Sequence, residues 1–193
     1  LYLSEDPEVS LELVAAPPSD LSALTLVHRQ SRLGRSLKRT GDFVFSAAVL
    51  GLGSPLFLLL AVLVKLSSPG PVFYVQKRVG RGYQGFGCIK FRTMRPDADA
   101  VLAEVLDRSP AMRAEFERDF KLRNDPRITP IGRFLRRSSL DELPQFLNVL
   151  RGEMSVVGPR PIVGKEIARY GDYMDEVLAV RPGLTGLWQV SGR

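Results

Sequence analysis

The hydrophobic pattern of this chain is dominated by one uncharged run, which extends from Phe43 to Val64. About 20 apolar residues are enough to cross the hydrocarbon core of a bilayer, so the run has membrane length. Ser54 and Pro55 lie near its middle, and a proline inside a helix removes a backbone hydrogen bond and clashes with the carbonyl four residues earlier. The pattern therefore predicts a helix broken at Ser54 and Pro55 into two arms, each too short to span a bilayer alone.

Three interpretations fit a broken apolar helix: a core helix of a soluble protein, a kinked membrane span, and a helix that enters the membrane and returns. The flanking charges help to choose between them, because cytoplasmic flanks of membrane segments are rich in lysine and arginine. Basic residues lie on both sides of the run, namely Arg35, Lys38 and Arg39 before it and Lys65, Lys77, Arg78 and Arg81 after it. Since both flanks are positive, we predict a re-entrant membrane helix over residues 43–64.

Two strand-like runs, residues 71–80 and 86–94, follow the apolar segment and are joined by a glycine-rich loop. Gly80, Gly82 and Gly85 match the spacing G-x-G-x-x-G. The dinucleotide-binding fingerprint, however, needs a helix directly after the glycines, whereas here a second strand-like run follows. We therefore predict a β-hairpin with a glycine turn.

Residues 97–120 are predicted to be helical, with an interruption at Pro110. Asp97 and Asp99 form a D-x-D at the start of this segment, the spacing with which many sugar-nucleotide transferases bind a divalent metal. Acidic side chains at a helix start also complement the helix dipole, and we favour this second explanation. The sole histidine, His28, has no second histidine with which to build a metal site. These patterns together predict an α+β fold that is mostly helical with a small β-hairpin.

Composition changes this picture mainly through charge. Hydrophobic residues make up 45% of the chain, which is ordinary for a globular protein, so one hydrophobic segment does not make this a multispanning protein. The formal net charge is +6, and all 27 lysines and arginines lie at or after Arg29, which suits an anionic partner. We divide the chain into an acidic N-terminal extension or linker, residues 1–35, and a basic domain, residues 36–193. We expect a piece of a longer protein with a truncated C-terminus.

The densest polar cluster lies in residues 136–161. Ser139 and Glu142 have the S-x-x-E spacing of a capping box, which predicts that a helix begins here with Pro144 in its first turn. Asp141 and Glu142 would then lie at the N-terminus of that helix. The simplest explanation of the two acids is that they cap it.

Arginines in the flanking segments favour a second explanation. Arg133, Arg136 and Arg137 precede the two acids, and Arg160 lies between two prolines that fix its backbone. A helix N-terminus with arginines converging on it is a phosphate site. Carboxylates repel phosphate unless one of them is a nucleophile or a metal ligand. Adjacent side chains on a helix point in different directions, so the two acids should have different roles.

These blocks together resemble the monotopic phosphoglycosyl transferases of bacteria, the polyprenyl-phosphate sugar-phosphotransferases that begin capsule, O-antigen and exopolysaccharide assembly. The resemblance covers about residues 36–193. It is carried by "KRTGDFVFS", the segment broken at "SP", "GPVFYVQKRVG", "KFRTM", "RRSSLDELPQFLNVLRGEMSVVGPRP" and "RPGLTGLWQVSGR". It implies that the broken helix re-enters the membrane and anchors the domain at the cytoplasmic face of the bacterial inner membrane.

The resemblance also implies a reaction. Asp141 attacks the sugar-linked phosphate of a UDP-sugar, UMP leaves, and the enzyme holds the phosphosugar covalently until polyprenyl phosphate, normally undecaprenyl phosphate, accepts it. Glu142 assists with metal binding or proton handling, and both acids are implied to hold Mg²⁺. By motif position, four basic residues bind phosphates: Lys90, Arg92, Arg136 and Arg160. The implied partners are the donor, the lipid acceptor and an anionic membrane surface, and not nucleic acid.

Two other functions stay open at this point. A non-catalytic basic module that binds nucleic acid or anionic lipid at a membrane surface predicts aromatic residues interleaved for stacking, whereas aromatic residues make up only 8% of the chain. A D-x-D glycosyltransferase would transfer the sugar without its phosphate and release UDP. The nucleotide product, UMP or UDP, therefore distinguishes the two enzymatic hypotheses.

Overall fold

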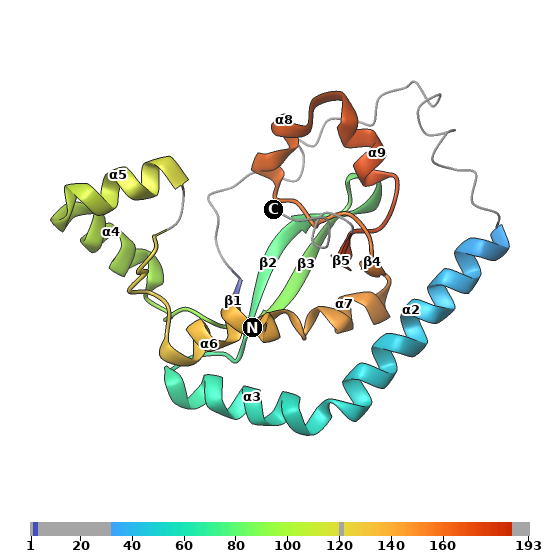
Figure 1. The fold of residues 1–193 in the computed structure, drawn as a ribbon, viewed down its shortest axis with the longest axis horizontal. Helices are drawn as coiled ribbons and strands as arrows, with labels where there is room; N and C mark the ends of the chain where they lie inside the picture. Colours follow the sequence, from blue (N-terminus) through green and yellow to red (C-terminus); the bar gives the residue numbers. More distant parts are fainter. Residues whose placement is uncertain (1, 4–31, 120–121, 187–193) are drawn as a thin grey trace.

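The computed structural model (Figure 1) describes residues 2–3, 32–119 and 122–186, so His28 and nearly all of the predicted extension lie outside the described residues. The described part is mostly helical with two small sheets, which confirms the predicted α+β class. The helices are α2 (Arg32–Leu52), α3 (Ser54–Ser67), α4 (Ala98–Arg108), α5 (Pro110–Asp119), α6 (Pro130–Ser138), α7 (Gln145–Arg151), α8 (Ile167–Tyr170) and α9 (Met174–Leu178). The strands are β1 (Tyr2–Leu3), β2 (Phe73–Val79), β3 (Gly85–Phe91), β4 (Ser155–Val157) and β5 (Gly183–Thr185), and the 3₁₀ turns are η2 (Arg81–Tyr83), η3 (Leu140–Glu142), η4 (Gly164–Glu166) and η5 (Gly171–Tyr173).

The apolar run forms the end of α2 and most of α3, which meet at the predicted break. Gly53 precedes α3, and Pro55 occupies its first turn, where a missing backbone N–H costs little. The first arm is longer than predicted, because α2 already begins at Arg32. Within the described residues no single helix has both the length and the apolar character needed to cross a membrane, whereas α2 and α3 pass that test together with a 64° bend between them.

Helix α3 packs against the body of the protein with one face only. Leu60 and Val64 are buried with Phe91 and Leu135 in one core cluster. The rings of Phe57 and Phe91 lie 5.8 Å apart between their centroids. Most of the remaining large apolar side chains of the bent pair are exposed, among them Phe43, Val44, Phe45, Leu52, Leu56, Leu58, Leu59, Val62, Leu63 and Leu66.

The central hairpin confirms the two predicted strands. Strands β2 and β3 pair antiparallel from Phe73 opposite Phe91 to Val79 opposite Gly85. In the turn between them, Gly82 and the following Tyr83 both have positive φ angles, of 63° and 62°. Because strand β3 follows the glycines directly, the G-x-G-x-x-G spacing marks a hairpin turn, as predicted. The hairpin places the side chains of two strands on a common face that the site uses.

Helices α4 and α5 confirm the helical prediction for residues 97–120 and its interruption before Pro110. The pair projects from the body at one side (Figure 1). Asp97 directly precedes α4 and Asp99 lies in its first turn. Both carboxylate oxygens of Asp97 accept hydrogen bonds from Arg95, at 2.9 and 2.8 Å. These positions agree with the helix-start explanation of the D-x-D.

The predicted helix start at Ser139 is wrong. Ser139 ends α6 in a left-handed conformation, with φ of 57°, and its side chain makes no capping hydrogen bond. An N-cap residue needs an extended backbone, whereas a left-handed residue closes a helix C-terminus. The chain then makes the 3₁₀ turn η3, and α7 begins only after Pro144. The two acids therefore lie in a short turn between two helices rather than at the start of a long one.

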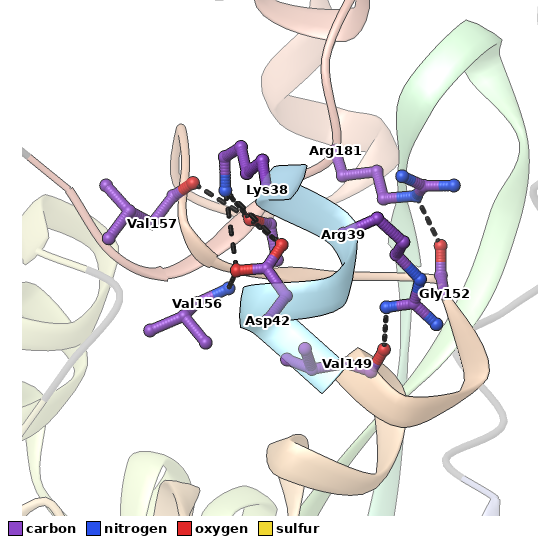
Figure 2. A network of polar contacts seen from close by, with 9 residues as sticks. Lys38, Arg39, Asp42, Val149, Gly152, Val156, Val157 and Arg181 are labelled. Atoms are coloured by element: carbon purple, nitrogen blue, oxygen red, sulfur yellow. Dashed lines mark hydrogen bonds and ion pairs between the residues drawn. The ribbon is translucent and has the colours of Figure 1, made fainter. Parts of the chain in front are cut away.

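The middle of α2, at residues 38–42, is attached to the body by polar contacts (Figure 2). The carboxylate of Asp42, which is buried, accepts hydrogen bonds from the Ser155 hydroxyl at 2.7 Å and the Val156 backbone N–H at 3.2 Å. Lys38 donates to both Asp42 and Ser155. Arg39 donates to the carbonyls of Val149, at 2.5 Å, and Leu150, at 2.9 Å, at the end of α7. These contacts fix α2 relative to β4 and α7.

Candidate active site

One face of the central hairpin carries the polar side chains of the candidate site. Successive residues of a strand point to opposite faces, so Tyr74, Gln76 and Arg78 of β2 share a face. The register pairs Tyr74 with Lys90 and Gln76 with Cys88, which puts the two β3 residues on that face as well. Sequence reasoning found Lys90 through its motif, and the hairpin register adds Arg78 to the same surface.

Asp141 and Glu142 occupy the 3₁₀ turn Leu140–Glu142, which we call the dyad turn. The Lys90 ammonium donates to Oε1 of Glu142 at 2.7 Å, and both side chains are partly exposed. Asp141 is half-buried beside the same lysine and Arg136, whose charges both act on its carboxylate. The structure thus brings together four of the predicted site residues: Lys90, Arg136, Asp141 and Glu142.

The electrostatics of the dyad turn separate its two acids. Burial raises the pKa of Asp141, and the neighbouring charge of Glu142 adds to this effect, whereas Lys90 and Arg136 oppose it. Removal from water disfavours the charged form of a carboxylate, which is why burial acts in this direction. Glu142 is held instead by a direct ion pair with Lys90. The two adjacent acids therefore differ in their surroundings: burial is the main influence on Asp141, whereas Glu142 pairs directly with Lys90.

Arg136 is positioned by a partner outside the turn. Its Nε donates to the Thr93 hydroxyl at 2.9 Å, which leaves the terminal nitrogens of the guanidinium for other groups. Burial lowers the pKa of Arg136, and the charges of Asp141 and Asp125 oppose the shift. An arginine guanidinium stays protonated at neutral pH. Arg136 therefore supplies a fixed positive charge beside Asp141.

Arg160 lies in a loop that the backbone holds on both sides, residues 158–163, which we call the arginine loop. On one side the Gly158 N–H donates to the Thr185 carbonyl at 2.9 Å, and the Gly183 N–H donates to the Pro159 carbonyl at 2.7 Å. The other side is held by β2, to which Ile162 forms an isolated bridge opposite Val79. The side chain of Arg160 is exposed. The loop therefore presents Arg160 from a fixed backbone, as its two prolines predicted.

Arg78 connects the arginine loop to the hairpin, and sequence reasoning had used it only as a flanking charge of the membrane segment. Burial lowers its pKa, and the charge of Arg160 lowers it further, whereas the charges of Glu166 and Glu142 oppose the shift. Arg78 therefore lies within electrostatic reach of both Arg160 and Glu142. The strand pattern identifies Arg78: it lies on the same face of β2 as Gln76 and Tyr74, and Tyr74 is paired with Lys90 of β3.

The hydrogen bonds of Arg92 connect it to the end of α3 and not to the dyad turn. Its buried guanidinium donates to the Ser68 carbonyl at 2.7 Å and to the Ser68 hydroxyl at 3.0 Å, just after α3. Lys90 and Arg92 would share a face of a continuous strand, but β3 ends at Phe91. The contacts of Arg92 thus join the end of α3 to the hairpin, where a cation suits the negative end of the helix dipole.

The acidic residues also limit what metal the site can hold. Among the described residues no three His, Cys, Asp or Glu side chains are grouped in a way that could hold a metal ion. Asp141 and Glu142 offer two adjacent carboxylates, which is the set that Mg²⁺ uses when substrate phosphates and water supply its other ligands. Residues 141 and 142 are therefore compatible with a Mg²⁺ whose other ligands come from substrate phosphates and water.

Comparison with known proteins gives consistent matches. The model of the bacterial sugar transferase family matches residues 33–193. The chain is 54% identical over 162 residues to the undecaprenyl-phosphate galactose phosphotransferase of Salmonella typhimurium, which covers 84% of this chain and 34% of that protein. It is 51% identical over 161 residues to the exopolysaccharide production protein ExoY of Rhizobium meliloti, with 83% and 71% covered.

The name of a third relative states both substrates. The UDP-glucose:undecaprenyl-phosphate glucose-1-phosphate transferase of Escherichia coli is 40% identical over 166 residues, which is 84% of this chain and 32% of that protein. The chain thus spans about a third of the length of the first and third of these relatives. The region that the family model matches contains the hairpin, the dyad turn and the arginine loop.

Proposed function

The chain belongs to the bacterial sugar transferase family, and on this premise we propose that it transfers a phosphosugar from a UDP-sugar to polyprenyl phosphate and releases UMP. Undecaprenyl phosphate is the acceptor that the relatives' names favour. The product would be a polyprenyl diphosphate sugar, the first membrane intermediate in making an exopolysaccharide, capsule or O-antigen. The observation that carries the proposal is the dyad turn, in which a half-buried Asp141 lies beside Lys90 and Arg136.

The proposed reaction proceeds in two displacements. A carboxylate oxygen of Asp141 attacks the phosphorus bonded to the sugar oxygen, and the bond from this phosphorus to the oxygen that bridges the two phosphates breaks, so that UMP leaves with that oxygen. An oxygen of polyprenyl phosphate then attacks the same phosphorus and displaces the Asp141 carboxylate. Lys90 and Arg136 would offset the charge on the phosphate oxygens during both steps. The raised pKa of Asp141 fits a poorly solvated, reactive carboxylate.

We further propose that Mg²⁺ accompanies the donor and that Asp141 and Glu142 would hold it. When bound, it would offset the repulsion between the two carboxylates and the diphosphate. Lys90 already occupies one oxygen of Glu142 at 2.7 Å, so the lysine and the ion would share this side chain. Glu142 would then orient Lys90 and the donor phosphate.

The bent pair α2–α3 would anchor the domain. We propose that it dips into the bacterial inner membrane from the cytoplasmic face and returns, because basic residues lie on both of its flanks and most of its large apolar side chains are exposed. Burying such side chains in lipid contributes about 25 cal/mol per Å² of apolar surface. The middle of α2 is fixed to the body through Asp42 and Arg39 (Figure 2). This attachment would hold the dyad turn near the lipid acceptor.

An isotope experiment tests the chemistry. The protein is incubated with UDP-glucose or UDP-galactose labelled in the phosphate next to the sugar, with Mg²⁺ and without acceptor. We expect a covalent, hydroxylamine-sensitive adduct and one UMP released per adduct. Asp141→Asn should abolish both, because the amide has nearly the same shape and is a poor nucleophile. Glu142→Gln, the matched neighbour, should slow the reaction and still permit labelling.

Several outcomes would contradict this chemistry. Labelling of Asp141→Asn but not of Glu142→Gln would reverse the two roles. Release of UDP in place of UMP would point to sugar transfer without phosphate. Turnover that requires both substrates bound together and gives no adduct would make the two acids a metal site for direct transfer.

A labelling experiment tests the anchoring. Single cysteines at Ser36 and Ser67, both exposed, should react with an impermeant reagent from the same, cytoplasmic side of inverted membrane vesicles. The native Cys88 is buried and should stay unlabelled. Pro55→Ala should straighten the bend and move residue 67 toward the opposite side. Labelling of Ser36 and Ser67 from opposite sides in the unmodified helix would mean that α2 and α3 span the membrane.

A further inference from the structure

Arg78 makes an unusual set of contacts for a residue of a strand. One terminal nitrogen donates to the Pro161 carbonyl at 3.1 Å, and the other donates to Oε1 of Gln76 at 2.7 Å. Glu166 approaches the guanidinium at 3.9 Å. The side chain is 11% exposed, and its Nε is buried without a hydrogen-bond partner. Arg78 is thus a largely buried cation that donates a hydrogen bond to a backbone carbonyl.

This carbonyl belongs to Pro161, the residue directly after Arg160. The backbone on the far side of this contact is also fixed, since the Val79 N–H donates to the Ile162 carbonyl at 2.9 Å. The Val163 N–H donates to Glu166 at 3.0 Å, so the acid near Arg78 holds the end of the arginine loop. Arg78 is therefore the side chain through which the hairpin sets the direction of this loop.

Arg78 and Arg160 carry like charges within electrostatic reach of each other. Burial and the charge of Arg160 lower the pKa of Arg78, whereas the charge of Glu166, whose carboxylate lies 3.9 Å from the Arg78 guanidinium, opposes the shift. Arg160 itself is exposed, and arginine binds phosphate with two parallel hydrogen bonds.

We propose that Arg78 is a positioning residue for the donor: by holding the Pro161 carbonyl it directs Arg160 towards a phosphate of the bound nucleotide sugar. This inference rests on the proposed function and deepens it. It assigns to the hairpin a second task besides carrying Lys90. The polar face of the hairpin then serves the dyad turn with Lys90 and the arginine loop with Arg78.

A double-mutant cycle tests the inference, with kcat and KM measured for UDP-glucose or UDP-galactose and undecaprenyl phosphate as acceptor. In the unmodified background Arg78→Gln should lower kcat/KM about tenfold, mainly through a higher KM for the donor. In the Arg160→Ala background the same change should cost less than threefold, because Arg78 acts through Arg160. Arg78→Lys keeps the charge but cannot make the two hydrogen bonds of the guanidinium, so its kcat/KM should lie between those of the unmodified protein and Arg78→Gln.

The control is Lys77→Gln, an exposed lysine on the opposite face of β2, which should stay within about twofold of the unmodified protein. An equal loss from Arg78→Gln in both backgrounds would overturn the inference and leave the proposed function intact, as would full activity of Arg78→Gln. If Arg78→Gln does not fold, Arg78→Lys in the same two backgrounds decides by the same criterion. Failure of the unmodified protein to form adduct or release UMP would instead overturn the proposed function.

Discussion

The dyad turn and the arginine loop both face phosphate in the proposed reaction, but the protein holds them by different means. The acids of the dyad turn depend on side chains, since Glu142 is paired with Lys90 and the charges of Lys90 and Arg136 act on Asp141. The arginine loop depends on backbone pairing to β5 and β2. A site can therefore tune charge in one segment and fix geometry in another, and substitutions in the two should produce different defects.

Apart from the loss of Asp141 itself, the largest expected effect lies in the backbone of the arginine loop. A Cβ at Gly183 would lie 2.1 Å from the Gly158 nitrogen, so Gly183→Ala should force the loop away from β5. We expect kcat/KM to fall at least a hundredfold and the free energy of unfolding to fall by about 3 kcal/mol, as for severe overpacking. Donor turnover and a denaturant melt measure the two losses.

The control for this substitution is Gly164→Ala, where the added Cβ meets no atom within 4 Å. It should change turnover less than twofold. If Gly183→Ala were as harmless as Gly164→Ala, the arginine loop would not depend on its crossing with β5, and the contrast between the two segments would fail.

The second effect concerns charge in the dyad turn. Lys90→Met removes a charge that lowers the pKa of Asp141, so this pKa should rise further. Because the carboxylate must be ionised to attack, the acid limb of the kcat/KM profile should move to higher pH, with a loss of roughly tenfold or more at neutral pH. Glu142→Gln removes a charge that raises the same pKa, so it should move the limb to lower pH. Shifts in the same direction for both variants would contradict the electrostatic account of the dyad turn.

Arg160→Lys tests the loop without disturbing its backbone. Lysine keeps the charge but not the bidentate fork of arginine, so we expect a loss of about tenfold in kcat/KM, or roughly 1.4 kcal/mol. The acid limb of the pH profile should stay in place, in contrast with Lys90→Met. Unchanged turnover of the Lys variant would reduce Arg160 to a structural residue.

The smallest effect is expected outside both segments. Asp97 is held by two hydrogen bonds from Arg95 at the start of α4, in an exposed position where such pairs contribute little. Asp97→Asn should therefore leave turnover within about twofold and the nucleotide product unchanged. A large loss would revive the D-x-D as a metal site.

Much of the fold was predictable because the relevant rules are local. The helix break at Ser54 and Pro55 and the hairpin with its glycine turn all follow from residues within one or two turns of the feature. The dyad turn was not predictable, because S-x-x-E spacing does not reveal that Ser139 takes a left-handed conformation as the end of α6.

The site residues show the same limit. Lys90 and Arg136 were predicted and lie beside the acids. Arg92 shares its motif with Lys90, but its direction depends on where β3 ends and on the carbonyl of Ser68. Arg78 was missed because its importance comes from Pro161, a residue far along the chain. Side chains that act across such distances need the three-dimensional pairing that a linear pattern lacks.

The crossing of Gly158 with Gly183 has a consequence for how the site matures during protein synthesis. The dyad turn and α7 precede β5 in the chain, so a ribosome synthesises both acids before the strand that fixes the arginine loop. At roughly 5–20 residues per second, the interval is on the order of seconds. A nascent chain thus carries its acids before the arginine loop has the strand that holds one of its sides. The parallel pairing of β4 with β5 accompanies the fixing of this loop.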